Sequence, residues 1–303
     1  MIDDLALVEA SFRAMGSDCR IICDLDSNAL HHSVFRIEDL ERRWSRFLPD
    51  SEISECNDRA GEWVDVSTIT ALLVERLIEA ERRTAGRFNP LLLHQLESLG
   101  YDESFPFPAK PASAVPSIAA ASGLAVAGGS VRVPSGAGVD PGGLGKGLAA
   151  DLVMADLLDA GATWAIVSLG GDIRLGGTHL AVTGQPVEIE NTSAPDAPRE
   201  RVRVADGAVA TSSIAKRRWT SSDGDELHHL LDPATGLSAH TSRRSATVHS
   251  ATAWWADVVA KCLIIDPTLG SAELADWDAR AIVCSTDGSL EHLGLDLAEP
   301  IVH

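Results

Sequence analysis

The stretch from residue 138 to residue 177 restricts the possible folds more than any other part of the chain. It begins with a glycine-rich turn at 139–147, VDPGGLGKG, and an apolar pattern at helical spacing follows and ends at Gly161. The run 164–169 is typical of a buried strand, and a second turn, GGD, follows at 170–172. The apolar face predicted for the helix consists of Leu144, Leu148, Leu152, Ala155 and Leu158. A turn, a helix, a strand and a turn are therefore expected at the centre of the fold.

The glycine-rich turn suits a ligand that carries phosphate. Glycine has no Cβ, so backbone amides approach a ligand closely, and the N-terminus of a helix favours negative charge. Lys146 adds a cation at the same place. The turn is not a P-loop, because Asp140 stands where that motif requires glycine, and its glycines are not spaced GxGxxG. The alternative interpretation is a purely structural joint between strand and helix.

Composition and charge exclude several classes of protein. The formal net charge of −19 over 303 residues disfavours binding to nucleic acid or to an anionic membrane surface. The first sixteen residues lack the basic and apolar pattern of a signal peptide, so none is expected, and no apolar run is long enough to predict a membrane-spanning helix. The five cysteines are dispersed, odd in number and without CxxC spacing, which favours reduced core residues. We therefore expect a cytoplasmic protein.

The remaining pattern predicts an α+β fold in a single unit spanning 1–303. Two antiparallel strands are expected within 5–25, and short strands within 178–210, with an exposed loop near 193–198. A proline-rich connector near 105–117 is the expected junction between two lobes. The other expected elements are a helix capped by Ser27, a short helix after residue 50, a helix from Ser67 to about Ala85, a helix at 251–264 and a strand at 280–285.

Three further stretches carry side chains that can do chemistry. A strand at 208–213 ends in hydroxyl groups, which can donate hydrogen bonds to phosphate or simply form a polar strand end. His228 and His229 precede the turn DPATG, where histidine is either a general base or a structural residue. Asp257 and Lys261 are four residues apart in a helical pattern and therefore neighbours, as an ordinary ion pair would be.

Taken in order, these stretches resemble the motifs of the FAD:protein FMN transferase family, ApbE, over nearly the whole chain. The similar segments are MGS at 15–17, SRFLPDSEISECN at 45–57, FNP at 88–90, DPGGLGKG at 140–147, LGGD at 169–172, ATS at 210–212, HLLDPATG at 229–236 and AD at 256–257. The resemblance implies an ApbE-type, T-fold-like architecture of antiparallel sheets flanked by helices, with the active site between two lobes.

The resemblance also implies a reaction in which FAD is a substrate. A Thr or Ser hydroxyl of an acceptor flavoprotein attacks the FMN-side phosphorus, and AMP leaves. His229 is implied as the base that takes the hydroxyl proton, a task suited to a pKa near neutral. His228 is its neighbour and would point to the opposite face of a strand. No nucleic acid and no membrane insertion are expected.

The resemblance further implies a set of residues for FAD and for Mg²⁺. The FAD-binding residues are Met15, Gly16, Phe47, Asn89, Asp140, Gly143, Gly145, Lys146, Gly170, Gly171, Asp172, Thr211, Ser212 and Asp232. The carbonyl of Gly145 and the carboxylate of Asp257 are implied as metal ligands. The third ligand of the family is a threonine, and this chain has Lys261 in its place. An ammonium has no lone pair for a metal, so Lys261 either supplies the positive charge itself or points aside.

Smaller departures from the family pattern are Phe47 for tyrosine, Asn89 for aspartate and Gly145 for alanine. Two alternative functions remain open at this point. One is an FAD pyrophosphatase that releases FMN and AMP, because water takes the place of the hydroxyl. The other is a non-catalytic FAD-binding protein, which the missing threonine makes conceivable.

Overall fold

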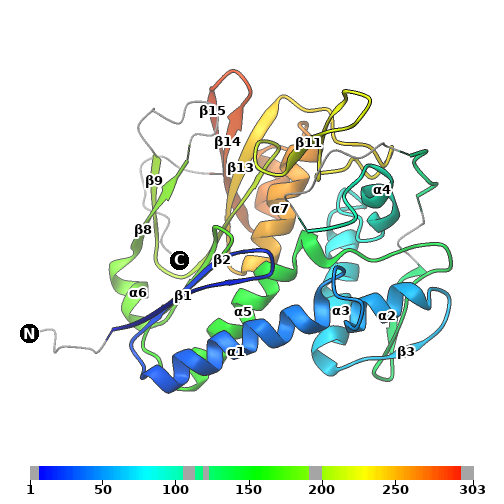
Figure 1. Cartoon of the computed structure of the whole chain (residues 1–303). Coiled ribbons are helices and arrows are strands. Elements are labelled where there is room, and N and C mark those ends of the chain that lie inside the picture. Colours follow the sequence, from blue (N-terminus) through cyan, green and yellow to red (C-terminus); the bar gives the residue numbers. More distant parts are fainter. Residues whose placement is uncertain (1–6, 105–112, 119–122, 191–199, 295–303) are drawn as a thin grey trace, which may run out of the picture.

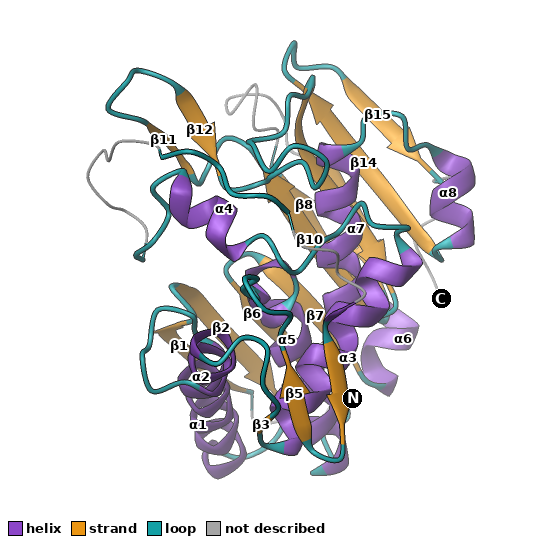
Figure 2. Cartoon of the chain, turned by 90° about the vertical axis from the view of Figure 1, so that its right-hand side faces the viewer, coloured by secondary structure: helices purple, strands orange, loops and turns teal. Residues whose placement is uncertain are grey.

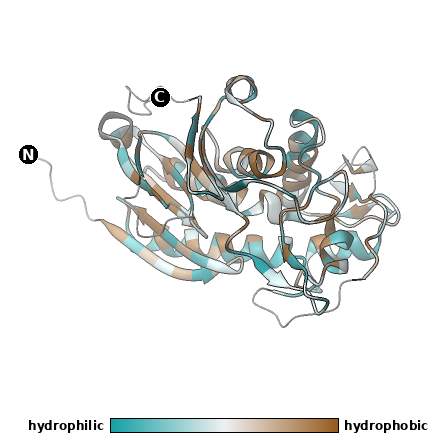
Figure 3. Cartoon of the chain, turned by 90° about the horizontal axis from the view of Figure 1, so that it is seen from above, coloured by the Kyte–Doolittle hydropathy of each residue, from teal (hydrophilic) through white to brown (hydrophobic). Residues whose placement is uncertain are grey.

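An eight-stranded antiparallel sheet forms the centre of the molecule (Figure 1). The computed structural model describes residues 7–104, 113–118, 123–190 and 200–294. In spatial order the strands are β1 (Val8–Ala14), β2 (Ser17–Cys23), β6 (Ala165–Leu169), β7 (Asp172–Gly176), β10 (Gly207–Ser213), β13 (Arg243–Ser250), β14 (Ala279–Ser285) and β15 (Leu290–Leu293). Along β1 exposed and half-buried residues alternate, as expected for a strand with one solvated face, and Figure 3 shows the matching alternation of hydropathy.

Helices cover one face of this sheet. α5 (Gly145–Asp159) packs on β6 and β7, α7 (Ala253–Ile265) packs on β10 and β13, and α1 (Ser27–Trp44) lies against β1 and α5 (Figures 1 and 2). Eleven of the thirteen residues of α7 are buried, which is typical of a helix enclosed on all sides. The prediction of an α+β fold with helices against antiparallel strands is confirmed.

The opposite face is covered by a smaller layer. The hairpin of β8 (Gln185–Ile189) and β9 (Glu200–Val204) and the helix α6 (Thr178–Thr183) meet the sheet through Leu175, Leu180, Val187, Val204 and Val209. The prediction that 178–210 contains only strands is therefore wrong for its first six residues. Gly177 and Gly184 bracket this single helical turn with positive φ angles of 110° and 59°, whereas its threonines and valine alone favour a strand. The loop predicted near 193–198 lies outside the described residues.

The remaining elements surround the helical face and the sheet edge. They are α2 (Glu52–Asp58), β3 (Val64–Asp65), α3 (Thr68–Arg83), α4 (Leu93–Ser98), β4 (Ala125–Ala127), β5 (Ser130–Arg132), η2 (Pro141–Gly143), β11 (Arg218–Thr220), β12 (Glu226–His228) and α8 (Ser271–Asp276). Ser67 caps α3 as predicted, but Asp26, not Ser27, caps α1. In the described part of the chain no helix has both the length and the apolarity needed to cross a membrane.

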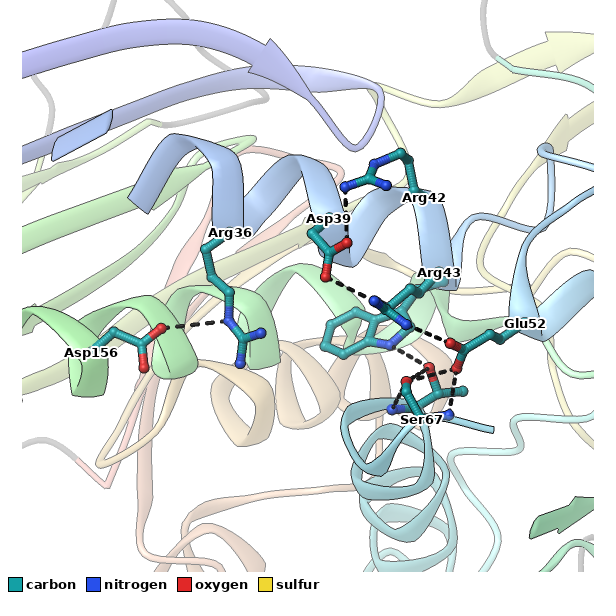
Figure 4. A network of polar contacts seen from close by, with 9 residues as sticks. Arg36, Asp39, Arg42, Arg43, Glu52, Ser67 and Asp156 are labelled. Atoms are coloured by element: carbon teal, nitrogen blue, oxygen red, sulfur yellow. Dashed lines mark hydrogen bonds and ion pairs between the residues drawn. The ribbon is translucent and has the colours of Figure 1, made fainter. Parts of the chain in front are cut away.

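A polar network fixes the turn between α1 and α2 (Figure 4). Arg43 donates to Glu52 at 2.7 Å, and Glu52 in turn accepts hydrogen bonds from the backbone and hydroxyl of Ser67 at 3.0 and 2.7 Å. The ends of α1, α2 and α3 therefore meet at one point. Arg46 and Phe47 lie in the turn between α1 and α2, so the network also fixes the backbone position of these two residues.

The predicted apolar face of α5 is correct only in part. Leu144 and Leu148 are buried, but Ala155 is exposed, whereas Val153 and Leu157 are buried without having been predicted. α5 contacts the sheet on one side and the helices α1 and α7 on its other sides. Its buried surface is therefore wider than a single apolar face, and Ala155 lies outside it.

α5 approaches the first turn of α7 closely at Gly147. A Cβ on Gly147 would lie 2.5 Å from the carbonyl oxygen of Ala253 and 2.6 Å from the backbone nitrogen of Trp254. Asp151, one turn later, accepts hydrogen bonds from Ala253 N and Trp254 N at 2.9 and 3.0 Å. The side chain of the N-cap residue, Thr252, makes no capping bond, so Asp151 caps α7 from a neighbouring helix. For Gly147, glycine is therefore required by the packing of α5 against α7, which agrees with the alternative interpretation of the glycine-rich turn as a structural joint.

We predict that Gly147→Ala destabilises the fold, because a methyl group meets α7 backbone that cannot rotate away. The expected loss is about 1–3 kcal/mol or more in the free energy of unfolding, measured by urea denaturation. Gly145→Ala is the matched control, since the nearest atom to its added Cβ is Pro141 Cβ at an ordinary 3.7 Å. Equal losses in the two variants would show that the α5–α7 contact does not require glycine.

Candidate active site

A cavity of about 290 Å³ opens where the α1–α2 turn, the segment 87–92, the start of α5 and the segment after β12 converge. Several residues predicted for the site line it: Met15, Gly16, Phe47, Asn89, Asp140, Gly143, Gly145, Lys146, His229 and Lys261. The structure therefore brings together, from distant parts of the sequence, most of the residues that carry the family resemblance.

The glycine-rich turn lines part of this cavity. Asp140 accepts a hydrogen bond from Gly142 N at 2.9 Å and thereby begins the short η2 helix, and α5 then starts at Gly145 and runs for fifteen residues. Lys146 lies in the first turn of α5 and is half-buried. Desolvation lowers its pKa, while the nearby carboxylates of Asp257 and Asp172 oppose that shift. A helix N-terminus with an ammonium beside it attracts an anion.

A buried cluster of charges lies behind the turn. Lys261 forms an ion pair with Asp257 Oδ1 across one turn of α7, with side chains only 11% and 3% exposed. Asp257 Oδ2 is buried and has no hydrogen-bond partner among the described residues. Burial and the charge of Asp257 raise the pKa of Asp172 to about 6. With Lys146 the cluster holds two ammonium groups and two carboxylates, so it is neutral when all four are ionised.

His229 reaches the cavity, and His228 does not line it. β12 ends at His228, whose ring Nε2 lies 3.1 Å from the carbonyl oxygen of Ala239. His229 Nδ1 lies 3.3 Å from the carbonyl oxygen of Arg217. Because a carbonyl only accepts, this bond places the proton on Nδ1 and leaves the lone pair on Nε2. Burial, followed by the charges of Arg217 and Lys261, holds the pKa of His229 well below 6.5, so its ring is neutral at pH 7.

Aromatic rings and an arginine form another part of the wall, which we call the aromatic wall: Phe47, Tyr101 and Arg46. The Arg46 guanidinium lies 4.1 Å from the ring centre of Phe47 and 4.8 Å from that of Tyr101. It donates to Tyr101 O at 2.8 Å and lies 3.5 Å from Asp140 Oδ1. Arg46, Tyr101 and Arg217 line the cavity but were not predicted. Arg46 stands beside Phe47 in a recognised motif, and Tyr101 is the only tyrosine of the chain, but no pattern marks Arg217.

Other predicted residues contribute from outside the cavity lining. Gly170 lies beside Lys146, because a Cβ there would be 3.3 Å from Lys146 Cε, and its φ of 67° favours glycine. Gly171 completes that turn with a φ of 95°. Asp232 accepts from Ala234 N at 2.9 Å and thus holds the turn after His229. Asp172 and Asp257 belong to the buried cluster behind Lys146.

The two hydroxyl residues of β10 that were predicted for the site, Thr211 and Ser212, lie on opposite faces of the sheet. Ser212 is buried, and its alternation with Ala208 and Ala210 places it on the face that α7 covers. Thr211 is exposed on the other face, and its hydroxyl lies 2.9 Å from that of Thr247. The structure therefore does not bring the Thr211 hydroxyl to the cavity. Its backbone N–H instead donates to Asp172 at 3.1 Å.

Relatives of known description share this sequence over most of their length. An FAD:protein FMN transferase from Treponema pallidum (strain Nichols) is 30% identical over 258 residues, which are 78% of this chain and 71% of the relative. An FAD:protein FMN transferase from Vibrio cholerae (strain ATCC 39541) is 26% identical over 279 residues, 88% of this chain and 83% of the relative.

Solved structures share the fold. The ApbE protein of Thermotoga maritima superposes with a TM-score of 0.81 at 23% identity, covering 95% of this chain and 97% of that one. The flavin transferase ApbE from Vibrio cholerae gives 0.78 at 23% identity, covering 94% and 96%. The sequence profile of the ApbE family matches residues 15–283, which include the glycine turn, the histidine and the buried charge cluster. The chain belongs to the ApbE family.

Proposed function

We propose that this protein transfers FMN from FAD to a Thr or Ser hydroxyl of an acceptor flavoprotein and releases AMP. The observation that carries the proposal is that a neutral His229 and the cationic start of α5 line the same cavity. The relatives named FAD:protein FMN transferase support it, since their similarity covers the glycine turn and the histidine segment alike. The five free, buried cysteines support a cytoplasmic location as a further part of the proposal.

The cavity lining suits two parts of FAD, the isoalloxazine ring and the pyrophosphate. Phe47 offers an aromatic ring to the isoalloxazine, and Met15 an adaptable apolar contact. Gly143 to Lys146 offer backbone N–H groups and an ammonium to the pyrophosphate. The ligand would therefore lie with its flavin against the aromatic wall and its reacting phosphate near His229.

His229 is suited to begin the transfer step. Its Nε2 lone pair takes the proton of the acceptor hydroxyl, whose oxygen forms the new bond to the FMN phosphorus. The bond from that phosphorus to the oxygen of AMP breaks, and AMP leaves with the electron pair. Little covalent chemistry falls to the protein, so positioning and charge neutralisation supply the rate.

The residues present do not fit the Mg²⁺ that the family resemblance implies. Asp257 Oδ1 already has Lys261 as its cationic partner, and an ammonium cannot coordinate a metal. Among the described residues no group of three or more His, Cys, Asp or Glu side chains gathers as a metal site. The neutral charge balance of the cluster also leaves no excess negative charge for a divalent ion. We therefore propose that Lys261 supplies the positive charge in the place of the metal.

A direct assay separates transfer from hydrolysis and from binding alone. The protein is incubated with FAD, with and without a flavoprotein that carries an accessible threonine, and AMP release and the mass of the acceptor are followed. Transfer requires AMP release together with an acceptor heavier by one FMN. AMP release without a heavier acceptor indicates a pyrophosphatase, and tight FAD binding without AMP indicates a binding protein.

We predict that His229→Asn lowers the transfer rate about 10²- to 10⁴-fold, the usual range for loss of a general base. FAD affinity should be nearly unchanged, because the flavin and pyrophosphate contacts remain. His228→Asn is the control and should have a far smaller effect, since His228 faces Ala239. A larger loss of activity in His228→Asn than in His229→Asn would show that the base is His228 and not His229.

The lowered pKa of His229 predicts the pH dependence of kcat/KM. The base must be neutral, so activity is present above the pKa of the ring in the folded protein and is lost as the pH falls through it. We expect the acid limb that belongs to His229 to lie below pH 6.5 and to be missing from the residual activity of His229→Asn. An acid limb above pH 6.5 would contradict the buried environment described for the ring.

We predict that Lys261→Thr makes AMP release depend more strongly on Mg²⁺, because it returns an oxygen ligand and removes a repelling charge. The unmodified protein should keep most of its activity in a chelator. Lys261→Met is the control, since it removes the charge without adding a ligand and should be impaired with or without Mg²⁺. If the unmodified protein is inactive in a chelator and saturates with Mg²⁺ as steeply as the Thr variant, Lys261 does not replace the metal.

A further inference from the structure

Arg217 is a cation of the cavity wall that neither the sequence motifs nor the proposed roles account for. It lies in the turn between β10 and β11, and its side chain is half-buried. Its guanidinium has no ion pair or hydrogen bond to any residue in the described ranges. Three other cations of the wall each have a carboxylate partner: Arg46 with Asp140, Arg87 with Asp266, and Lys261 with Asp257.

The position of Arg217 connects it to the reacting end of the cavity. Its backbone carbonyl oxygen accepts from His229 N at 3.3 Å and lies 3.3 Å from His229 Nδ1. The same residue therefore fixes the tautomer of the base and carries a guanidinium into the same cavity. Arg217, His229 and Lys146 line the same cavity, and the charge of Arg217 accordingly lowers the pKa of both other groups.

The charges of Lys146 and Arg217 favour an anionic ligand over a neutral one in this cavity. Lys146 and Arg217 both line the cavity, and in the part of the chain that the structure describes neither has a directly bonded carboxylate. The pyrophosphate of FAD carries two negative charges, and attack on phosphorus spreads charge over its oxygens. Arginine binds phosphate oxygens through two parallel N–H bonds, whereas lysine acts as a point charge.

We propose that Arg217 binds the FMN phosphate of FAD and neutralises its charge while the hydroxyl oxygen bonds to phosphorus and AMP departs. Lys146 holds the pyrophosphate from the α5 side, and Arg217 holds it from the His229 side. The proposal rests on the proposed function for its substrate, but it makes a claim about binding that is tested without turnover.

The first test compares three flavins that share one ring system. The dissociation constants of FAD, FMN and riboflavin are measured for the unmodified protein and for Arg217→Gln by titration of flavin fluorescence. Arg217→Gln should weaken FAD and FMN about 10- to 100-fold, as expected for the loss of a charged hydrogen bond, and should leave riboflavin unchanged because riboflavin has no phosphate. The substitution keeps the backbone carbonyl that bonds to His229.

Arg218→Gln is the matched control for this comparison. Arg218 is the next residue, but it is exposed and forms an ion pair with Glu226 across the β11–β12 hairpin, away from the cavity lining. It should bind all three flavins like the unmodified protein. If Arg217→Gln weakens riboflavin as much as FAD, or weakens none of them, Arg217 does not bind the phosphate.

The second test addresses catalysis. Arg217→Gln should lower kcat for AMP release about 10²- to 10³-fold, the usual loss for one donor to developing charge, and Arg217→Lys should retain more activity than Arg217→Gln because it keeps the charge. Full kcat in both variants would overturn the catalytic part of the proposal. If the unmodified protein binds FAD but releases no AMP, the proposed function fails, while the comparison of the three flavins still decides whether Arg217 binds phosphate.

Discussion

The contact between α5 and α7 is the constraint on which the cavity depends. Gly147 lets the backbone of α7 approach without a side chain between the helices, and Asp151 caps α7 from α5. Lys146 precedes this contact directly, and Asp257 lies one turn beyond Ala253. The close approach therefore brings an ammonium from one helix and a carboxylate from the other into a single buried cluster. A wider spacing would leave both charges buried with weaker compensation.

The molecule is acidic overall, but its cavity wall carries cations that favour an anionic ligand. The chain carries a formal charge of −19, yet the cavity wall presents Lys146 and Arg217 without a directly bonded carboxylate in the described ranges. Desolvation of the Lys146 ammonium is costly, and its lowered pKa shows that the nearby carboxylates of Asp257 and Asp172 offset this cost only in part. An anionic ligand relieves it. Repulsion by the acidic surface and attraction by the cavity then act together to direct anions to one place.

The sequence predicted local features well and contacts between distant segments poorly. The glycine turn and the start of α5 follow from neighbouring residues, because each has a local pattern. The choice of His229 over His228 came from the family resemblance, since the local pattern alone left both roles open. The cap that Asp151 places on α7 joins residues 102 positions apart, and no periodicity marks it. The face of Thr211 depends on the register of β10 within the sheet. Arg217 was missed because its significance arises only when its turn meets His229.

The contacts of Arg46 link the stability of the folded protein to the binding of a ligand in the cavity. Its guanidinium joins the end of α1 to Tyr101 and to Asp140, segments 55 and 94 residues further along the chain. A ligand held between the aromatic wall and the glycine turn would restrain all three segments at once. The abundance of flavin in the cell would then set how long the folded chain survives proteolysis, because a bound ligand stabilises the native state in proportion to the logarithm of its concentration.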